Sequence, residues 1–347
     1  MILAVLAGSW GCVRGAPAIE SQPWRQAVTK AITEARAVDP ERAAQLEELA
    51  RIAESAEAAA RADGGSLARR DRAVAAWSAA LRQAGDDLTE IRLMRAEELD
   101  RIASLLEAAH LEVERAGPRA MAAGSRREDA RAAAHARVRL EAGRRLLAAG
   151  DRTGAATALE DAIALADIAQ DSWRRQQDRI ADPALRLLWA RDVRETVSAS
   201  RRQGTTAVVV DKAARSLVVY RAGKPVARFP AEFGTAGLAP KRHAGDCATP
   251  EGRYRVAQVK TGGATRFYKA LLLDYPNAED RRRFAAARAA GEISPRVGIG
   301  SLIEIHGHGG EGRDWTEGCV ALTDEHMDRL LELVGRGAAV TIVGAAE

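Results

Sequence analysis

The sequence predicts an α+β multidomain chain, in which an all-α N-terminal part of helical bundles or hairpins precedes a mainly-β domain with short helices. Alanine and arginine dominate residues 17–203, where apolar residues recur at a spacing of three to four. From Gly204 onward valine, glycine, threonine and proline become frequent, and apolar residues alternate as in strands. A chain of 347 residues is long enough for two such cores. We therefore divide it into residues 1–16, 17–203 and 204–347.

The first segment, residues 1–16, opens with the short apolar run MILAVLAGSWG. This run is too short to span a bilayer as a helix, which needs about 20 residues. It is typical of an export signal, and the small Gly11 before Cys12 favours a lipid anchor on that cysteine. An ordinary buried N-terminal segment is the alternative. Export would place the protein in the periplasm or cell envelope.

The charge is nearly balanced along the chain. The formal net charge of +4 is the difference between 52 basic and 48 acidic residues. Binding to a nucleic-acid backbone needs a concentrated field of Lys and Arg, which this balance does not supply. The composition therefore argues against a nucleic-acid partner.

Residues 17–203 predict several helices separated by short turns. Asp39-Pro40-Glu41 supplies an N-cap and a first-turn proline for a helix that Gly64-Gly65 ends. Asp86-Asp87 predicts the start of another, which Gly117-Pro118 ends. Small residues on both sides of Gly150-Asp151 resemble one tetratricopeptide-type helical hairpin. We expect this part to act as a spacer or to bind a protein partner.

Residues 204–347 predict a β-meander followed by a mixed region. The meander consists of strands at 206–211, 217–220 and 226–229, joined by turns at Lys212–Arg215 and Gly223-Lys224. The other expected elements are strands at 253–256, 271–275, 303–305 and 339–343, and helices at 279–290 and 324–333.

Cys319 is the first candidate for chemistry. It follows Gly318 and precedes an apolar run, so a glycine turn leads into an apolar strand or the approach to a helix at this point. Such a turn allows the N–H groups of Gly318 and Cys319 to face a substrate carbonyl as an oxyanion hole. A free thiol has a pKa near ~8.5 and needs a base to become a nucleophile. His306, at the end of the strand expected at 303–305, is the candidate base.

The residues alone leave three other interpretations of Cys319 open. Zinc could be bound by His306, His308 and Cys319, because alternate residues of a strand share one face. A disulfide between Cys247 and Cys319 is compatible with an exported protein. A buried structural thiol is the third interpretation.

Five ordered motifs favour the nucleophile. They are Val210–Tyr220, Gly245–Tyr254, Tyr275-Pro276-Asn277, Ile305-His306-Gly307 and Gly318-Cys319. With these motifs in this order, the chain from about Thr206 to Val343 resembles the L,D-transpeptidase catalytic domain of the YkuD type.

The resemblance implies roles for four residues. Cys319 is the nucleophile, His306 its base, the carbonyl of Gly307 orients the imidazole, and the N–H groups of Gly318 and Cys319 form the oxyanion hole. The substrate is a peptidoglycan stem tetrapeptide, whose diaminopimelate carbonyl forms a thioester as D-alanine leaves. An amine of a second stem peptide, a protein lysine or water then resolves the thioester. The resemblance implies no metal and no organic cofactor.

Further residues are expected at the substrate, and two depart from the family pattern. The expected substrate-binding residues are His308, Thr316, Tyr275 and Asn277. Glu317 stands where family members commonly have histidine, and Ala321 where they have arginine. These departures leave room for a hydrolytic amidase or L,D-carboxypeptidase of the same family. A catalytically weak wall-binding module is another alternative, because an inward-facing Glu317 would oppose ionisation of the thiol.

Overall fold

The computed structural model describes residues 20–62, 66–122 and 124–346. The contacts divide the chain into two compact units between Ala103 and Ser104, within helix α3 (Leu67–Ala120). The segment 1–16 with Cys12 lies outside the described residues, so the export signal and the lipid anchor stay predictions, as do the domain boundaries at 16/17 and 203/204. None of the described helices is both long and apolar enough to cross a membrane.

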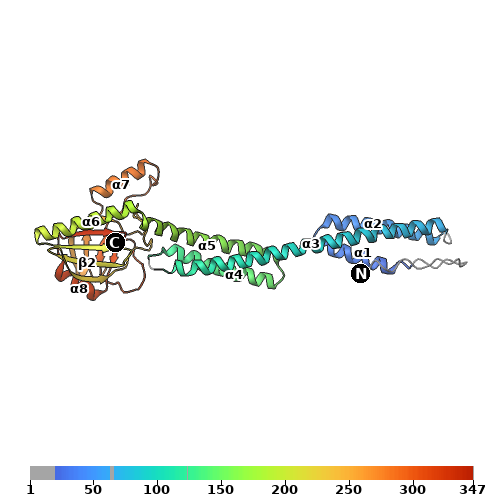
Figure 1. The fold of residues 1–347 in the computed structure, drawn as a ribbon, viewed down its shortest axis with the longest axis horizontal. Coiled ribbons are helices and arrows are strands. Elements are labelled where there is room, and N and C mark those ends of the chain that lie inside the picture. The colour runs from blue at the N-terminus through green and yellow to red at the C-terminus, as the bar shows by residue number, and fades with distance from the viewer. Residues whose placement is uncertain (1–19, 63–65, 123, 347) are drawn as a thin grey trace. The chain divides into compact units, whose positions relative to one another are not determined.

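The first unit contains α1 (Gln22–Arg36), α2 (Pro40–Ala62) and the first part of α3 (Figure 1). Its core is mostly alanine around the buried ring of Trp77. The small side chains let the helix backbones approach closely. Buried Glu57 is satisfied within this core, because its carboxylate accepts hydrogen bonds from Trp77 Nε1 at 2.9 Å and from a serine hydroxyl at 2.7 Å.

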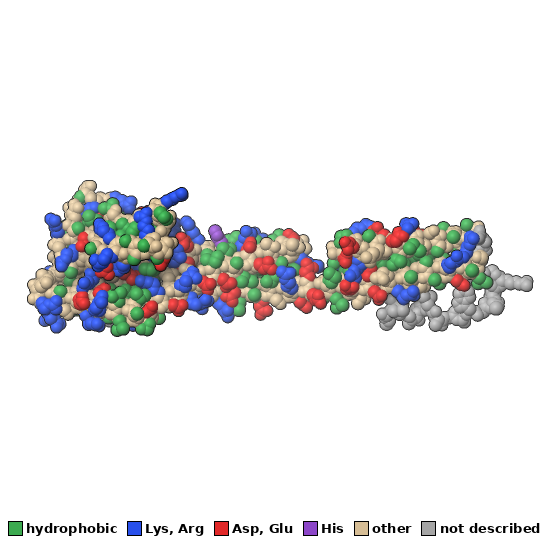
Figure 2. Space-filling model, turned by 90° about the horizontal axis from the view of Figure 1, so that it is seen from above, with side chains coloured by type: hydrophobic (Ala, Val, Ile, Leu, Met, Phe, Trp, Pro, Cys, Tyr) green, Lys and Arg blue, Asp and Glu red, His purple; other side chains and the backbone are tan. Residues whose placement is uncertain are grey.

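The expected N-cap of the second helix is confirmed. Asp39 Oδ1 accepts a hydrogen bond from the backbone N–H of Arg42 at 3.1 Å, and α2 begins at Pro40. The expected end at Gly64-Gly65 lies outside the described residues. On the face shown in Figure 2, Lys and Arg side chains are interspersed with Asp and Glu, as the near balance of charge predicts.

The predicted helix start at Asp86-Asp87 is wrong. Helix α3 runs through these residues without interruption. The carboxylate of Asp87 accepts a hydrogen bond from Gln83 Nε2, one turn earlier in α3, at 2.8 Å. It also pairs with Arg42 of α2, so Asp87 is a mid-helix residue with side-chain partners and not an N-cap. The predicted end at Gly117-Pro118 is early by one turn, because α3 continues to Ala120 with Pro118 inside.

The expected hairpin around Gly150-Asp151 is confirmed. It consists of α4 (Arg127–Ala148) and α5 (Arg152–Ala181). Asp151 caps α5, since its Oδ1 accepts from the backbone N–H of Gly154 at 2.9 Å.

The sheet of the second unit has eight strands in the order β3-β2-β1-β8-β4-β5-β6-β7, and it is curled (Figure 1). Helix α6 (Pro183–Gln203) packs on it: Thr196 Oγ1 lies 2.6 Å from Thr341 Oγ1, and Trp189 packs against Val343. The strands are β1 (Thr206–Asp211), β2 (Ser216–Arg221), β3 (Lys224–Pro230), β4 (Gly252–Thr261), β5 (Lys269–Leu273), β6 (Glu304–His306), β7 (Val320–Ala321) and β8 (Ala339–Val343).

The predicted α+β class is confirmed. The first three strands form the predicted antiparallel meander, and β8 closes parallel on β1. The two short helices are α7 (Ala278–Ala289) and α8 (Asp324–Leu333). The bounds of two strands differ from prediction: β4 runs on to Thr261, and β5 lies two residues earlier than expected. The apolar run after Cys319 forms the two-residue strand β7, one of the two continuations expected there.

Candidate active site

The sheet register brings the histidine and the cysteine together. Strand β6 pairs antiparallel with β5 and parallel with β7, which places His306 opposite Ala321. Cys319 therefore lies two residues before Ala321, the residue that pairs with His306. The backbone N–H of Glu304 also points at Cys319 Sγ, with 3.4 Å between nitrogen and sulfur. Pairing of strands, rather than closeness in sequence, assembles the two groups.

Both groups line one cavity of about 920 Å³. Trp315, Arg266 and Phe267 line it as well. A space of this size accommodates a peptide segment of several residues.

His306 is held in a fixed orientation. Its ring is fully buried, with Phe267 stacked on it at 3.6 Å between ring centroids and Trp315 edge-on at 5.7 Å. Its Nδ1 lies 2.6 Å from the carbonyl oxygen of Gly307, as the resemblance implied. A carbonyl only accepts, so Nδ1 carries the hydrogen and Nε2 is left with a lone pair. Nε2 has no hydrogen-bond partner within the part of the chain that the structure describes.

Burial keeps both groups neutral at pH 7. It lowers the pKa of His306 to about 4, against the opposite influence of the Gly307 carbonyl and of Glu304. Burial also raises the pKa of the Cys319 thiol, although the Glu304 N–H acts in the other direction. The free protein thus holds a neutral thiol and a neutral imidazole in one cavity, so the thiol needs a base during the attack, as expected of a cysteine with an ordinary or raised pKa.

We expect the buried imidazole to make the fold less stable in mild acid. The folded pKa lies below the ordinary value of 6.5, so the unfolded state binds the proton more readily. Stability from this group is complete above pH 6.5 and is lost progressively as the pH falls to about 4, by about 3 kcal/mol in all. Chemical denaturation of the parent and of His306→Gln at pH 7 and pH 4.5 measures this. Equal losses in the two proteins would contradict it.

The turn before Cys319 requires glycine and is held by Thr316. Gly318 has φ +127°, and a Cβ there would lie 2.7 Å from the carbonyl oxygen of Ala248. Thr316 Oγ1 donates to the Cys319 carbonyl at 2.8 Å and accepts from the Gly318 N–H at 3.2 Å. The Gly318 N–H is therefore already occupied, whereas the Cys319 N–H has no partner among residues 20–62, 66–122 and 124–346.

We expect Gly318→Ala to cost on the order of 3 kcal/mol of folding free energy and most of the activity, because the methyl group meets both a forbidden φ and a carbonyl. Thermal unfolding and a turnover assay measure this. Gly263→Ala is the matched control, since its Cβ would meet nothing within 4 Å. If the two variants melt alike, the turn does not need glycine.

The four expected substrate-binding residues lie in different places. Thr316 lines the cavity but supports the nucleophile turn through its hydroxyl. His308 is exposed, with φ +63°, and is not among the residues that line the cavity. Asn277 caps α7, since its Oδ1 accepts from the N–H of Glu279 at 2.9 Å.

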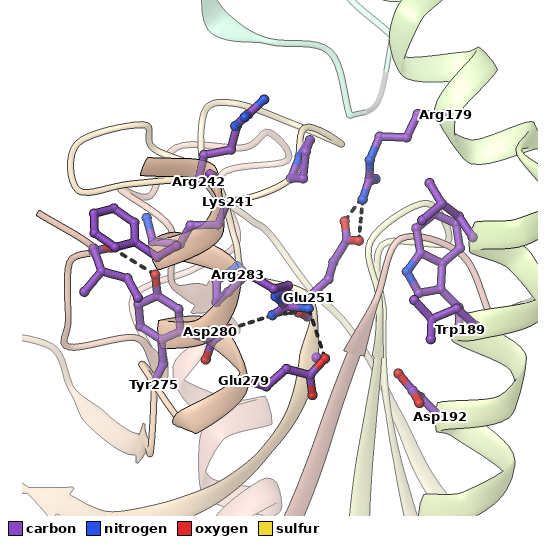
Figure 3. Close-up of a pocket in the computed structure, with 18 of the residues that line it drawn as sticks. Arg179, Trp189, Asp192, Lys241, Arg242, Glu251, Tyr275, Glu279, Asp280 and Arg283 are labelled. Carbon is purple, nitrogen blue, oxygen red and sulfur yellow. Dashed lines mark hydrogen bonds and ion pairs between the residues drawn. The ribbon is translucent and has the colours of Figure 1, made fainter. Parts of the chain in front are cut away.

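Tyr275 lies in a second cavity, of about 370 Å³ (Figure 3). Its hydroxyl donates to the carbonyl of Ile299 at 3.0 Å. Trp189 and Asp192 reach this cavity from α6, and the ion pair of Arg179 with Glu251 lies beside it (Figure 3). Substrate contacts of Tyr275 and Asn277 stay predictions that these positions do not favour.

The alternatives for Cys319 can be compared with the geometry. Cys247 and Cys319 are free cysteines, so the disulfide is not formed. The described residues contain no group of three or more His, Cys, Asp or Glu that could hold a metal ion. Glu317 is exposed, and the acidic side chain that acts on the thiol is Glu304, which is paired with Lys260 at 2.7 Å.

Sequence reasoning missed the aromatic enclosure of the histidine. Phe267 comes from the loop after β4, 39 residues before His306 in the chain, and no local pattern links the two. Trp315 stands next to Thr316 and could have been found as the aromatic residue of the same motif.

The fold and the site define a cysteine–histidine domain on a curled sheet. Residues 205–342 match the family model described as the L,D-transpeptidase catalytic domain, YkuD. The C-terminal part of the chain therefore matches the L,D-transpeptidase catalytic domain of the YkuD type, the family that its motifs predicted.

Similar proteins include an Escherichia coli K12 protein named "Putative L,D-transpeptidase YafK", with 31% identity over 101 residues, or 29% of this chain and 33% of that protein. The chain thus matches about a third of the length of its curated relatives. Among solved structures, Bdellovibrio bacteriovorus Bd1075 has 21% identity and a TM-score of 0.31, over 42% of this chain and 50% of that one. An L,D-transpeptidase from Xylanimonas cellulosilytica has 16% identity and a TM-score of 0.28, over 40% and 60%.

Proposed function

We propose that this protein is a peptidoglycan L,D-transpeptidase of the cell envelope, which carries the acyl group of a stem tetrapeptide on Cys319. The observation that supports this most strongly is the orientation of His306: Nδ1 is fixed on the Gly307 carbonyl, and Nε2 lacks a partner in the described structure. Its lone pair is thus unpaired, and the thiol of Cys319 lines the same cavity, where it donates to the carbonyl of Leu302 at 3.7 Å.

The proposed first step begins from the neutral pair. Cys319 Sγ attacks the carbonyl carbon of the L-centre of diaminopimelate while Nε2 of His306 takes the thiol proton. The electron pair of the carbonyl moves to oxygen, and the N–H of Cys319 stabilises the resulting oxyanion. When the intermediate collapses, the bond to D-alanine breaks, Nε2 returns the proton to the leaving amine, and a thioester remains.

The second step transfers the acyl group. An acceptor attacks the thioester, gives a proton to Nε2 of His306 and displaces the sulfur, which regains that proton. An amine of another stem peptide yields a crosslink, a protein lysine yields an attached protein, and water yields a shortened stem. The exposed Glu317 at the cavity edge is compatible with any of these acceptors.

Incubation with purified tetrapeptide muropeptides tests the proposal. We expect release of D-alanine and a product whose mass shows crosslinking, with neither from Cys319→Ala. If the products are tripeptide muropeptides and none is crosslinked, the protein is the hydrolytic alternative, an L,D-carboxypeptidase. Unchanged muropeptides with the parent protein would leave the wall-binding module as the function.

A further inference from the structure

A basic groove adjoins the catalytic cavity. It has a volume of about 420 Å³ and lies between the start of α4 and the loop that carries Cys247. Gly245 and Cys247 line both this groove and the cavity of Cys319, so the two spaces meet there. Arg127 and Arg131 of α4 line the groove on the other side.

Hydrogen bonds fix the start of α4 relative to the nucleophile turn. The N–H of Arg127 donates to the carbonyl of Thr235 at 2.8 Å, and the N–H of Thr235 donates to the carbonyl of Thr316 at 3.0 Å. Thr316 in turn holds the Cys319 carbonyl at 2.8 Å. Gly237 fits closely here, because a Cβ on it would lie 1.9 Å from the carbonyl oxygen of Gly124. Helix α4 is therefore built into the wall of the site.

The two arginines present uncompensated charge. Both are exposed, and within the described chain no ion pair or side-chain hydrogen bond involves either of them. They lie four residues apart on one helix, which places them on the same face with Cβ atoms about 6 Å apart. The acidic groups of the groove are otherwise engaged, Glu128 with Arg126 and Asp246 with Lys241 and three backbone N–H groups.

An exposed guanidinium pair beside a peptide site is suited to a carboxylate, which it can bind with two parallel hydrogen bonds. A stem peptide carries such a group on the glutamyl residue before diaminopimelate. One residue spans at most about 3.6 Å of chain, so this group lies within a residue or two of the attacked carbonyl. We propose that Arg127 and Arg131 bind the glutamyl carboxylate of the stem peptide, so that the helical part contributes directly to substrate recognition.

This inference rests on the proposed function, and a binding experiment separates the two. Full-length Cys319→Ala protein is titrated calorimetrically with a tetrapeptide stem whose glutamyl carboxylate is either free or amidated. We expect Arg127→Gln/Arg131→Gln to weaken binding of the free acid by about tenfold and to change binding of the amide little. Lysine at both positions should restore much of the affinity, which should also fall with added salt.

The matched control is Arg137→Gln/Arg145→Gln, which removes two exposed charges further along α4 and should bind like the parent. Equal affinity of the parent for the two peptides, or equal losses for both in the double variant, would overturn the inference. If the free-acid peptide binds more tightly than the amide but the protein with intact Cys319 forms no thioester, the proposed function is wrong and this inference stands. If Arg127→Gln/Arg131→Gln with intact Cys319 forms the thioester with an unchanged KM, this inference is wrong and the proposed function stands.

Discussion

Cys319→Ala is expected to remove all covalent chemistry and to leave the fold intact. Cys319 lines the cavity of His306 and stands two residues before Ala321, the residue paired with His306, and alanine fills most of the space of cysteine. A carbapenem-type β-lactam should add one covalent mass to the parent and none to the variant, as intact-protein mass spectrometry measures.

Cys247→Ala is the matched control for this experiment. Cys247 lines the same cavity and is also a free thiol, but its Sγ lies at the carbonyl of Gly245, at 3.6 Å, on a loop far in sequence from strand β6. We expect this variant to be acylated as the parent is. An adduct that survives in Cys319→Ala and disappears in Cys247→Ala would assign the nucleophile to the wrong cysteine.

His306→Gln is expected to lower the acylation rate by about 10³-fold, within the range for loss of a general base. Because the thiol is neutral at rest, the imidazole must take its proton during the attack. The rate of the parent should fall as the pH drops through about 4, where Nε2 becomes protonated. At high pH the variant should recover in part, since hydroxide then ionises the thiol directly. Single-turnover acylation across the pH range measures both effects.

His308→Gln is the control, because this exposed histidine lies outside the cavity lining. It should retain the rate and the pH profile of the parent within a small factor. If both variants lose the rate equally, the orientation of His306 on the Gly307 carbonyl does not single out the base.

Much of the C-terminal domain could be predicted from the sequence. Short runs of β-branched and apolar residues defined β1 and β2, and the helix at Asp324–Leu333 agrees with its predicted bounds, because these are local patterns. The helical part was harder, since acidic pairs such as Asp86-Asp87 suit both a helix start and a helix interior. Only the partners of Asp87 on α2 and α3 decide between these.

The sequence named candidate site residues but did not predict their electrostatics. His306, Gly307 and Cys319 stand in recognisable motifs, and the contact of the His306 ring with the Gly307 carbonyl is the one that the resemblance implied, whereas the catalytic roles stay predictions. Their pKa directions depend on burial under Phe267 and Trp315, which come from elsewhere in the chain. The occupied N–H of Gly318 likewise follows from a rotamer of Thr316 that no sequence pattern specifies.

The parallel pairing of β6 with β7 has a consequence for variation within the family. The register of β6 and β7, in which His306 pairs with Ala321, sets the separation of the base from the nucleophile. The length of the connecting segment, residues 307–318, does not set it. That segment can gain or lose residues next to the exposed Glu311 and Arg313 while the two reacting groups keep their alignment, provided that the N–H groups of Gly310 and Gly312 keep their hydrogen bonds to Glu232. The length of the segment 307–318 can therefore differ between relatives that admit different acyl acceptors.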